Sequence, residues 1–282
     1  MIACYDLARC PPTYDAVAFL AAVEVERLRR GADHVDIYVL PGPAGGFRRD
    51  SLWPHTVEER IHLRDRVLVP LCGLLPCARR MHVLSDRRDV APSEFGVNRY
   101  GIGLPAIMRA LRAGSRPLRS ARAPLLREPD LVTFTLRESD HHQLRNSRTE
   151  EWLAAAEVLR ARGLRVRIVR DTVMALDRLV NDCPSASAFV AERAALYARA
   201  ALNVGICNGP MWMSIFMGVP ALMLRPTTNA ARGCYDDAFY AEHGLPRGAQ
   251  LPTSPLHQRL VWQEDTRDNI VQAVEDMMGA VG

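Results

Sequence analysis

The stretch of sequence that decides the fold is residues 203–224, NVGICNGPMWMSIFMGVPALML. Its beginning and its end are apolar, and each predicts a short strand. The apolar segment between them predicts a short helix, which Gly218 ends. A strand, a helix and a second strand in this order form the repeating unit of a parallel sheet. The stretch therefore predicts an α/β fold.

The turn between the first strand and the helix is Asn208-Gly209-Pro210. Asn208 and Gly209 can adopt the left-handed backbone that a sharp turn requires, and Pro210 suits the first helical position. The N–H groups from Met211 onward would then point out of the turn, where they could bind phosphate. Ser214, further along the helix, joins these candidate phosphate-binding residues. Ligands bind at such turns because they lie at the carboxyl ends of parallel strands.

Strands and helices alternate along the rest of the chain, on both sides of a connector at 114–130 that is rich in Gly, Pro and Arg. Apolar runs predict further strands at 2–5, 35–40, 81–84, 131–136, 164–169 and 258–262. We therefore expect two Rossmann-like lobes with a cleft between them. Residues 1–120 would form the N-terminal, acceptor-side lobe and residues 121–282 the C-terminal, nucleotide-sugar-binding lobe.

Local signals also predict where individual helices begin and end. Thr13 can cap a helix that runs to about Arg30. Ser147 and Glu150 have the spacing of a capping box, with Ser147 as the cap of the next helix. A further helix is expected at 187–201, leading into the central stretch.

Composition is that of an ordinary folded protein, 282 residues long, 48% hydrophobic and 24% charged. No run of apolar residues is long enough to span a membrane, and the N-terminus lacks the features of a signal peptide. The seven cysteines form neither a disulfide framework nor a zinc pattern. We expect a cytoplasmic protein without a bound metal.

All 36 basic residues are arginine, so arginine must perform any phosphate-binding role that lysine might otherwise have. Many of these arginines lie in the stretch 99–127. They could contact an anionic acceptor or the inner face of the membrane peripherally, although a solvated connector explains them better. No nucleic-acid-binding signature accompanies them, and we expect no nucleic-acid partner.

Polar residues that follow the predicted strands are candidates for ligand binding. Arg137 could bind a diphosphate bidentately, or it could form an ion pair with its neighbour Glu138. Arg145 and Asn146 precede a helix and suit an anion, although helix capping also explains Asn146. Asp171 could accept hydrogen bonds from ribose hydroxyls, or it could cap the next segment.

The Asn-Gly-Pro turn, the short apolar helix and the Gly-Val-Pro-Ala-Leu that follows resemble the sugar-nucleotide site of GT-B glycosyltransferases. The pattern is similar to that of the lipopolysaccharide heptosyltransferases and other family 9-like enzymes, which carry Thr-Gly-Pro and then Gly-Val-Pro. The resemblance covers roughly residues 131–278. Cys207 and Met213 replace an acidic residue and a histidine of that family, so the resemblance does not identify the sugar or the nucleotide of the donor. Fucosyltransferase-like GT-B enzymes match Arg137 equally well, and a structural turn of any doubly wound fold remains the alternative.

The resemblance implies a metal-independent glycosyltransferase that takes a nucleotide sugar as substrate and uses no cofactor. Its acceptor would be a glycan, a lipid-linked molecule or a protein. In such enzymes a carboxylate of the N-terminal lobe activates the acceptor hydroxyl; Asp15 is the first candidate and Asp6 the second, although an aspartate at a helix start needs no function. A sugar-nucleotide epimerase of the same fold and a non-catalytic binding module are the alternatives.

Overall fold

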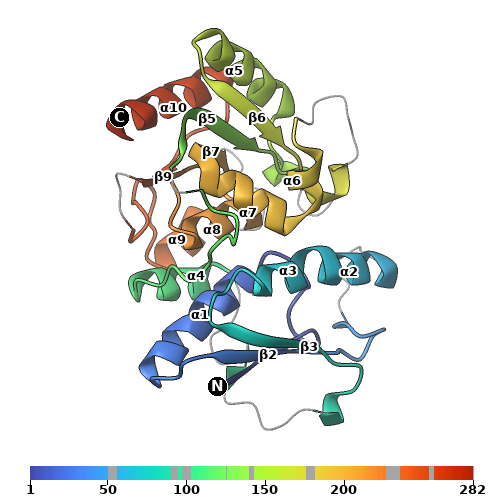
Figure 1. Cartoon of the computed structure of the whole chain (residues 1–282). Helices are drawn as coiled ribbons and strands as arrows, with labels where there is room; N and C mark the ends of the chain where they lie inside the picture. Colours follow the sequence, from blue (N-terminus) through green and yellow to red (C-terminus); the bar gives the residue numbers. More distant parts are fainter. Residues whose placement is uncertain are drawn as a thin grey trace. The chain divides into compact units, whose positions relative to one another are not determined.

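The computed structural model describes residues 1–49, 56–89, 95–96, 103–124, 126–139, 143–175, 182–226, 236–253 and 257–281. It divides into two compact units, Met1–Arg119 and Ser120–Gly282 (Figure 1). The division falls within the connector expected from the sequence. Each unit is described by itself.

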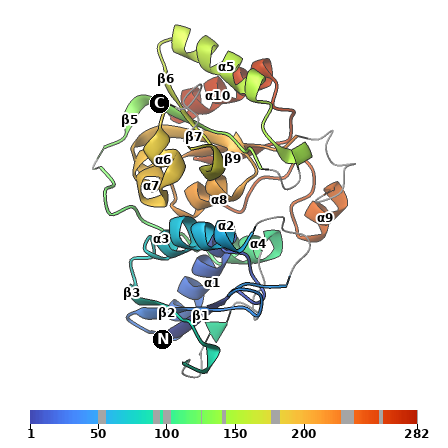
Figure 2. The ribbon, with the colours of Figure 1, turned by 90° about the vertical axis from the view of Figure 1, so that its right-hand side faces the viewer.

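Unit 1 contains a parallel sheet with the strand order β3-β2-β1-β4. Its strands are β1 (Ile2–Asp6), β2 (Val35–Leu40), β3 (Ala78–Val83) and β4 (Phe95–Gly96). Its helices are α1 (Ala16–Arg29), α2 (Val57–Leu63), the π-helical segment η1 (Arg64–Leu68), α3 (Val69–Cys72), the 3-10 segment η2 (Arg87–Asp89) and α4 (Leu104–Arg112). In both views the labelled helices lie on one side of the sheet (Figures 1 and 2). Accordingly Ile37 and Val39 are fully buried, whereas Tyr38 between them is only partly buried.

Unit 2 contains a parallel sheet with the strand order β6-β5-β7-β8-β9. Its strands are β5 (Glu128–Thr135), β6 (Arg165–Val169), β7 (Ala200–Ile206), β8 (Ala221–Leu224) and β9 (Gln258–Val261). Its helices are α5 (Thr149–Ala161), α6 (Pro184–Ala188), α7 (Val190–Arg199), α8 (Gly209–Phe216), α9 (Asp237–Glu242) and α10 (Arg267–Val281), with short 3-10 segments at Gln143–Arg145 and Thr172–Met174. Helices α5 and α10 cover one face of the sheet, and α6, α7 and α8 cover the other (Figure 2).

The central stretch folds as predicted, into β7, α8 and β8. All residues of β7 are buried, which a central strand covered by helices on both faces requires. Gly205 is needed within it, because a Cβ there would lie 2.9 Å from the Thr135 carbonyl oxygen and 2.9 Å from Cγ of Met211. Gly218 ends α8 with a φ of 68°, a left-handed conformation that favours glycine. The predicted α/β fold class is confirmed.

The predicted capping box at Ser147 is wrong. Helix α5 begins at Thr149, and the Ser147 hydroxyl accepts a hydrogen bond from the Arg137 N–H instead. The start of α5 is held by Asp265, whose carboxylate accepts from the Arg148 N–H and from the Trp152 indole N–H, each at 2.9 Å. Asp265 is far away in the sequence, so no local pattern points to it.

Two other predicted boundaries differ from the structure. The helix expected at 187–201 is broken at Phe189, whose backbone is extended, and β7 already begins at Ala200. The first helix begins at Ala16 with Asp15 as the N-cap residue. Thr13 lies before the helix, and its hydroxyl donates a hydrogen bond to the Asp15 carboxylate at 3.2 Å.

The strand order of each sheet determines where its topological switch point lies. In unit 2 the chain passes from β5 to β6 at one side and then returns to β7 at the other side of β5. In unit 1 the corresponding point lies between β1 and β4. In open α/β sheets, ligands bind outside the carboxyl ends of the strands at such points. The residues that follow β5, β7 and β1 are therefore the candidates for function.

Candidate functional site

The loop after β5 begins with Arg137, which is buried. Its N–H donates to the Ser147 hydroxyl at 2.9 Å, and its carbonyl accepts from the Ser147 N–H at 3.0 Å. The Asn146 amide binds both backbone groups of Ser139 at 3.0 Å, and its oxygen also accepts from the Arg137 guanidinium. Asn146 therefore shapes this loop and orients Arg137, a role that the sequence does not reveal.

Arg145 connects this loop to the turn after β7. Its guanidinium donates to the carbonyl oxygen of Cys207 at 3.2 Å. Because Cys207 directly precedes the N-cap of α8, this hydrogen bond brings a positive charge to the amino end of that helix. The partial positive charge of the helix end and the guanidinium favour an anion at the same place. Arg145 is thus a predicted phosphate-binding residue from another loop that the structure ties directly to the turn.

The backbone of the turn differs from the prediction. Asn208 is extended, with a φ of −141°, and Gly209 and Pro210 are the first two residues of α8. The Asn208 side chain accepts from the Met211 N–H at 3.0 Å. The fully buried Ser214 hydroxyl donates to the Met211 carbonyl at 2.7 Å. The Met211 N–H and the Ser214 hydroxyl thus make hydrogen bonds inside α8. Because these two groups are engaged, the arginines become the main candidates for binding phosphate.

Glu138 forms its ion pair with Arg170, which directly follows β6, and not with Arg137. The Arg170 guanidinium binds both carboxylate oxygens of Glu138, one of them at 2.7 Å, and both side chains are nearly buried. Asp171 accepts from the Thr172 N–H at 2.7 Å and from the Glu138 N–H at 3.5 Å. Asp171 therefore lies beside the loop after β5, although its capping role also accounts for its position.

Sequence reasoning missed two arginines of this edge, Arg170 and Arg225. Arg225 directly follows β8 and is 5% exposed. Its guanidinium lies over the ring of Tyr240, 4.0 Å from the ring centroid. The signal was available, since Arg137, Arg170 and Arg225 each follow a parallel strand within two residues. Carboxyl ends of parallel strands share one edge of a sheet, so these side chains gather there.

The switch point of unit 1 holds Asp6 and Asp15 on the connection from β1 to α1. Asp6 binds the Arg87 guanidinium through both oxygens, at 2.7 and 2.9 Å, and accepts from the Ala8 N–H. Burial opposes ionisation, but the hydrogen bonds from Arg87 and Ala8 outweigh it and lower the pKa of Asp6. Asp15 caps no N–H of α1 with its side chain. A carboxylate committed to an arginine is the poorer base, which counts against Asp6.

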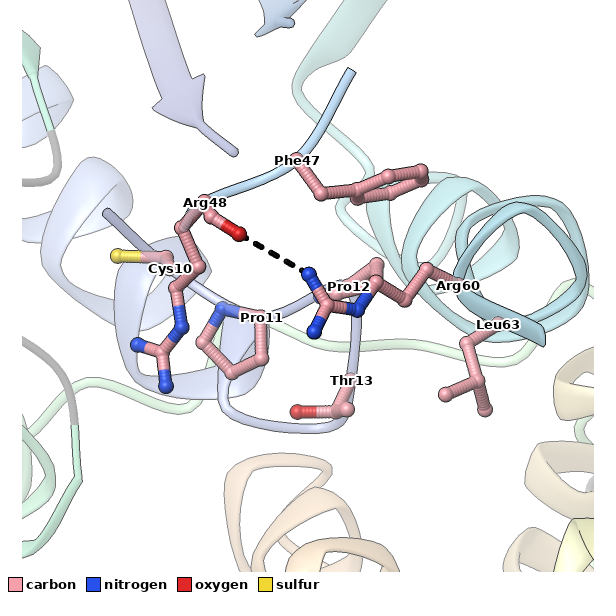
Figure 3. A pocket seen from close by; sticks show the side chains of 8 residues that line it. All are labelled: Cys10, Pro11, Pro12, Thr13, Phe47, Arg48, Arg60 and Leu63. Atoms are coloured by element: carbon pink, nitrogen blue, oxygen red, sulfur yellow. Dashed lines mark hydrogen bonds between the residues drawn. The ribbon is translucent and has the colours of Figure 1, made fainter. Parts of the chain in front are cut away.

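A narrow hollow lies beside the connection from β1 to α1 in the same unit (Figure 3). Its empty space, which includes open solvent at its mouth, is about 280 Å³. The lining residues are Cys10, Pro11, Pro12 and Thr13 from the connection after β1, Phe47 and Arg48 from the connection after β2, and Arg60 and Leu63 of α2. The Arg60 guanidinium spans it and donates to the Arg48 carbonyl at 3.0 Å.

The arginines of the connector are largely engaged with the protein itself. Arg116 and Arg119 donate to nearby backbone carbonyls, and Arg122 forms an ion pair with Glu192. No helix in the described ranges is long and apolar enough to cross a membrane. The described part of the chain also shows no group of three or more side chains that could hold a metal ion. Asp140, His141 and His142, which resemble a phosphoesterase motif, lie outside the described residues.

Two parallel sheets, each with candidate ligand-binding residues at its switch point, define a Rossmann-like α/β protein of two units. No protein-family model matches the chain, and no curated protein matches it in sequence. Among solved structures it is similar to the iron-containing dodecameric heptosyltransferase TibC of enterotoxigenic Escherichia coli, in complex with ADP-D-β-D-heptose. That likeness has a TM-score of 0.55 at 12% identity and covers all of this chain and 76% of TibC.

Two other solved structures are less similar. E. coli heptosyltransferase WaaC with ADP has a TM-score of 0.47 at 12% identity, covering 100% of this chain and 99% of WaaC. A family 9 glycosyl transferase from Veillonella parvula has a TM-score of 0.44 at 10% identity, covering 98% and 97% of the two chains. At these identities the comparison shows similarity of fold alone. It rests on TibC, whose TM-score of 0.55 is the highest of the three. The chain thus shares with TibC an α/β fold built from parallel sheets.

Proposed function

We propose that this chain is a glycosyltransferase that transfers a sugar from a nucleotide-sugar donor to an acceptor hydroxyl without a cofactor or a metal ion. One observation carries the proposal. The Arg145 guanidinium donates to the Cys207 carbonyl, which brings a cation to the amino end of α8 at the switch point of unit 2. Similarity of fold to TibC, whose structure contains ADP-heptose, supports the class of donor.

Breaking the bond between the sugar and the diphosphate leaves negative charge on the departing nucleoside diphosphate. Arginine side chains held in place before the reaction stabilise that charge without reorganising. Arg137 is held by Asn146 and Arg145 by the turn, so both are oriented by the fold. Asp171, beside the same loop, would accept hydrogen bonds from the ribose.

The acceptor hydroxyl must lose its proton as its oxygen bonds to the anomeric carbon. We assign this proton to the Asp15 carboxylate, the first candidate from the sequence; the ion pair with Arg87 and the lowered pKa count against Asp6, the second candidate. The acceptor would be a glycan, a lipid-linked molecule or a protein. The protein would act in the cytoplasm, at the inner membrane face if the acceptor is lipid-linked.

The test is a thermal-shift screen of the full chain against nucleosides, nucleoside diphosphates and nucleotide sugars, followed by donor turnover with the best binder. A ligand that binds only the native state raises the melting temperature according to its excess over Kd. Nucleoside diphosphates should protect the fold and nucleosides much less, and turnover of the nucleotide sugar should release the nucleoside diphosphate. Equal protection by both classes would remove the diphosphate from the proposal. Binding without turnover of any donor would indicate a binding module, and a changed sugar on an intact donor would indicate an epimerase.

A further inference from the structure

Arg225 is a buried cation that the fold holds rigidly. The planar guanidinium lies 4.0 Å from the centroid of the Tyr240 ring and 4.9 Å from that of Trp262. The Trp262 indole N–H donates to the Ala249 carbonyl at 2.9 Å, which fixes that ring. Cation–π contacts of this kind are stronger when the cation is desolvated. The rings therefore orient the N–H groups of Arg225 before any ligand arrives.

The same cluster reaches the turn that opens α8. Burial raises the pKa of the Cys207 thiol to about 11, while Arg225 and Arg145 both act in the opposite direction, as does a hydrogen bond from Tyr240. The Cys207 N–H also donates to the carbonyl of Leu224 at 3.1 Å, so Arg225, the next residue, lies beside Cys207 on the neighbouring strand end. Arg145 also contacts the Cys207 carbonyl directly. Two arginines from separate loops thus accompany the residue before the N-cap.

Asp237, a carboxylate that contacts Arg225, also contacts a second arginine. Asp237 lies 3.3 Å from the Arg225 guanidinium and 3.5 Å from that of Arg247. Charge-assisted N–H···O bonds are typically about 2.7–2.9 Å long, so both contacts are loose. An anion at this edge would gain shorter hydrogen bonds from Arg225 than Asp237 makes with it.

We propose that Arg225 makes the site select two linked phosphate groups over a single one. Arg145 would bind one phosphate beside the turn, and Arg225 would bind the other. This inference rests on the proposed function and deepens it, because the selected group is the diphosphate that leaves with the nucleoside. An oriented guanidinium discriminates in this way because its planar fork matches phosphate oxygens bidentately.

The test measures binding of inorganic pyrophosphate and of inorganic phosphate to the full chain by calorimetry at constant ionic strength. These probes carry no base or sugar, so they report on the phosphate contacts alone. The wild type should bind pyrophosphate more tightly than phosphate. Arg225→Gln should weaken pyrophosphate binding about tenfold or more, the loss expected for a hydrogen bond to a charged group, and leave phosphate binding nearly unchanged. Arg247→Gln is the matched control, since it shares Asp237 but is 59% exposed, and both affinities should stay at the wild-type level.

The melting temperature of each variant without ligand shows whether it folds. If Arg225→Gln does not, Arg225→Lys keeps the charge without the fork and should lower the preference for pyrophosphate only in part. An unchanged preference in the folded variant, an equal loss of both ligands, or no pyrophosphate binding by the wild type would overturn the inference. Selective loss in a protein that turns over no nucleotide sugar would keep the role of Arg225 and reject the glycosyltransferase. Turnover of a nucleotide sugar, together with an unchanged preference for pyrophosphate in Arg225→Gln, would keep the glycosyltransferase and reject the role of Arg225.

Discussion

Replacing Asp15 by Asn tests the proposed base directly. The residue stands at the N-cap of α1, and its side chain caps no N–H of that helix. Its carboxylate accepts from the Thr13 hydroxyl at 3.2 Å, which an amide oxygen can also do. The substitution therefore removes a negative charge and the ability to take a proton, and it keeps the size and most of the hydrogen bonding.

The expected effects on stability and on activity differ widely in size. A charge at a helix end contributes about 0.3–1 kcal/mol, so the free energy of unfolding should fall by no more than about 1 kcal/mol. A general base contributes about 10²–10⁴-fold to turnover. Transfer to the acceptor should therefore fall by at least about two decades. Donor affinity should not change, because every donor-binding residue that we assign belongs to unit 2.

The assay follows product formation, donor binding and thermal unfolding in the same preparations. Asp6→Asn is the matched control, because it removes the other carboxylate of this connection and breaks the ion pair with Arg87. It should lose stability while keeping more transfer activity than Asp15→Asn. Normal transfer by Asp15→Asn would refute the assignment. If Asp15→Asn lost both donor binding and transfer, the fold would be disturbed, and the support for Asp15 as the base would also be removed.

Three further predictions follow from the described contacts. Arg137→Ala should weaken nucleoside diphosphate binding, measured by calorimetry, by about 1.5–3 kcal/mol, or roughly 10- to 150-fold. Arg137→Lys should recover part of this loss. If Arg137→Ala bound with wild-type affinity, Arg137 would only support the loop. Gly205→Ala should destabilise the protein by about 1–3 kcal/mol, because its Cβ would lie 2.9 Å from the Thr135 carbonyl oxygen. Gly279 has open space around the position of a Cβ, so Gly279→Ala should be neutral or stabilising. Denaturant titration of both variants measures these changes, and equal effects of the two substitutions would contradict the packing argument. Because the pKa of Asp6 is lowered in the folded state, its contribution is complete above the unfolded pKa of about 3.9 and is lost as the pH falls through the folded pKa. The stability difference between the wild type and Asp6→Asn should therefore shrink on acidification below about pH 4, and a difference that does not change with pH would exclude this linkage.

Predictions that depended on short-range periodicity succeeded. The apolar runs at 131–136 and 203–224 form β5, β7, α8 and β8, because the spacing of apolar residues determines which local structure can bury them. Predictions that depended on a single cap failed. Ser147 has the spacing of a capping box, yet its hydroxyl binds Arg137, and Asp265 holds the helix start instead. A short polar side chain has several local partners, and the sequence does not show which of them lies closest.

The sequence by itself determined that this is an α/β protein, that strand, turn and helix meet at Asn208, and that arginine takes any phosphate-binding role that lysine might otherwise have. These properties follow from local patterning and composition. Only the tertiary structure decided the order of the strands, and with it the switch points, the contact of Arg145 with Cys207 and the burial of Arg225. Such contacts join residues far apart in the chain. They form only after the sheet has aligned the carboxyl ends of its strands at one edge.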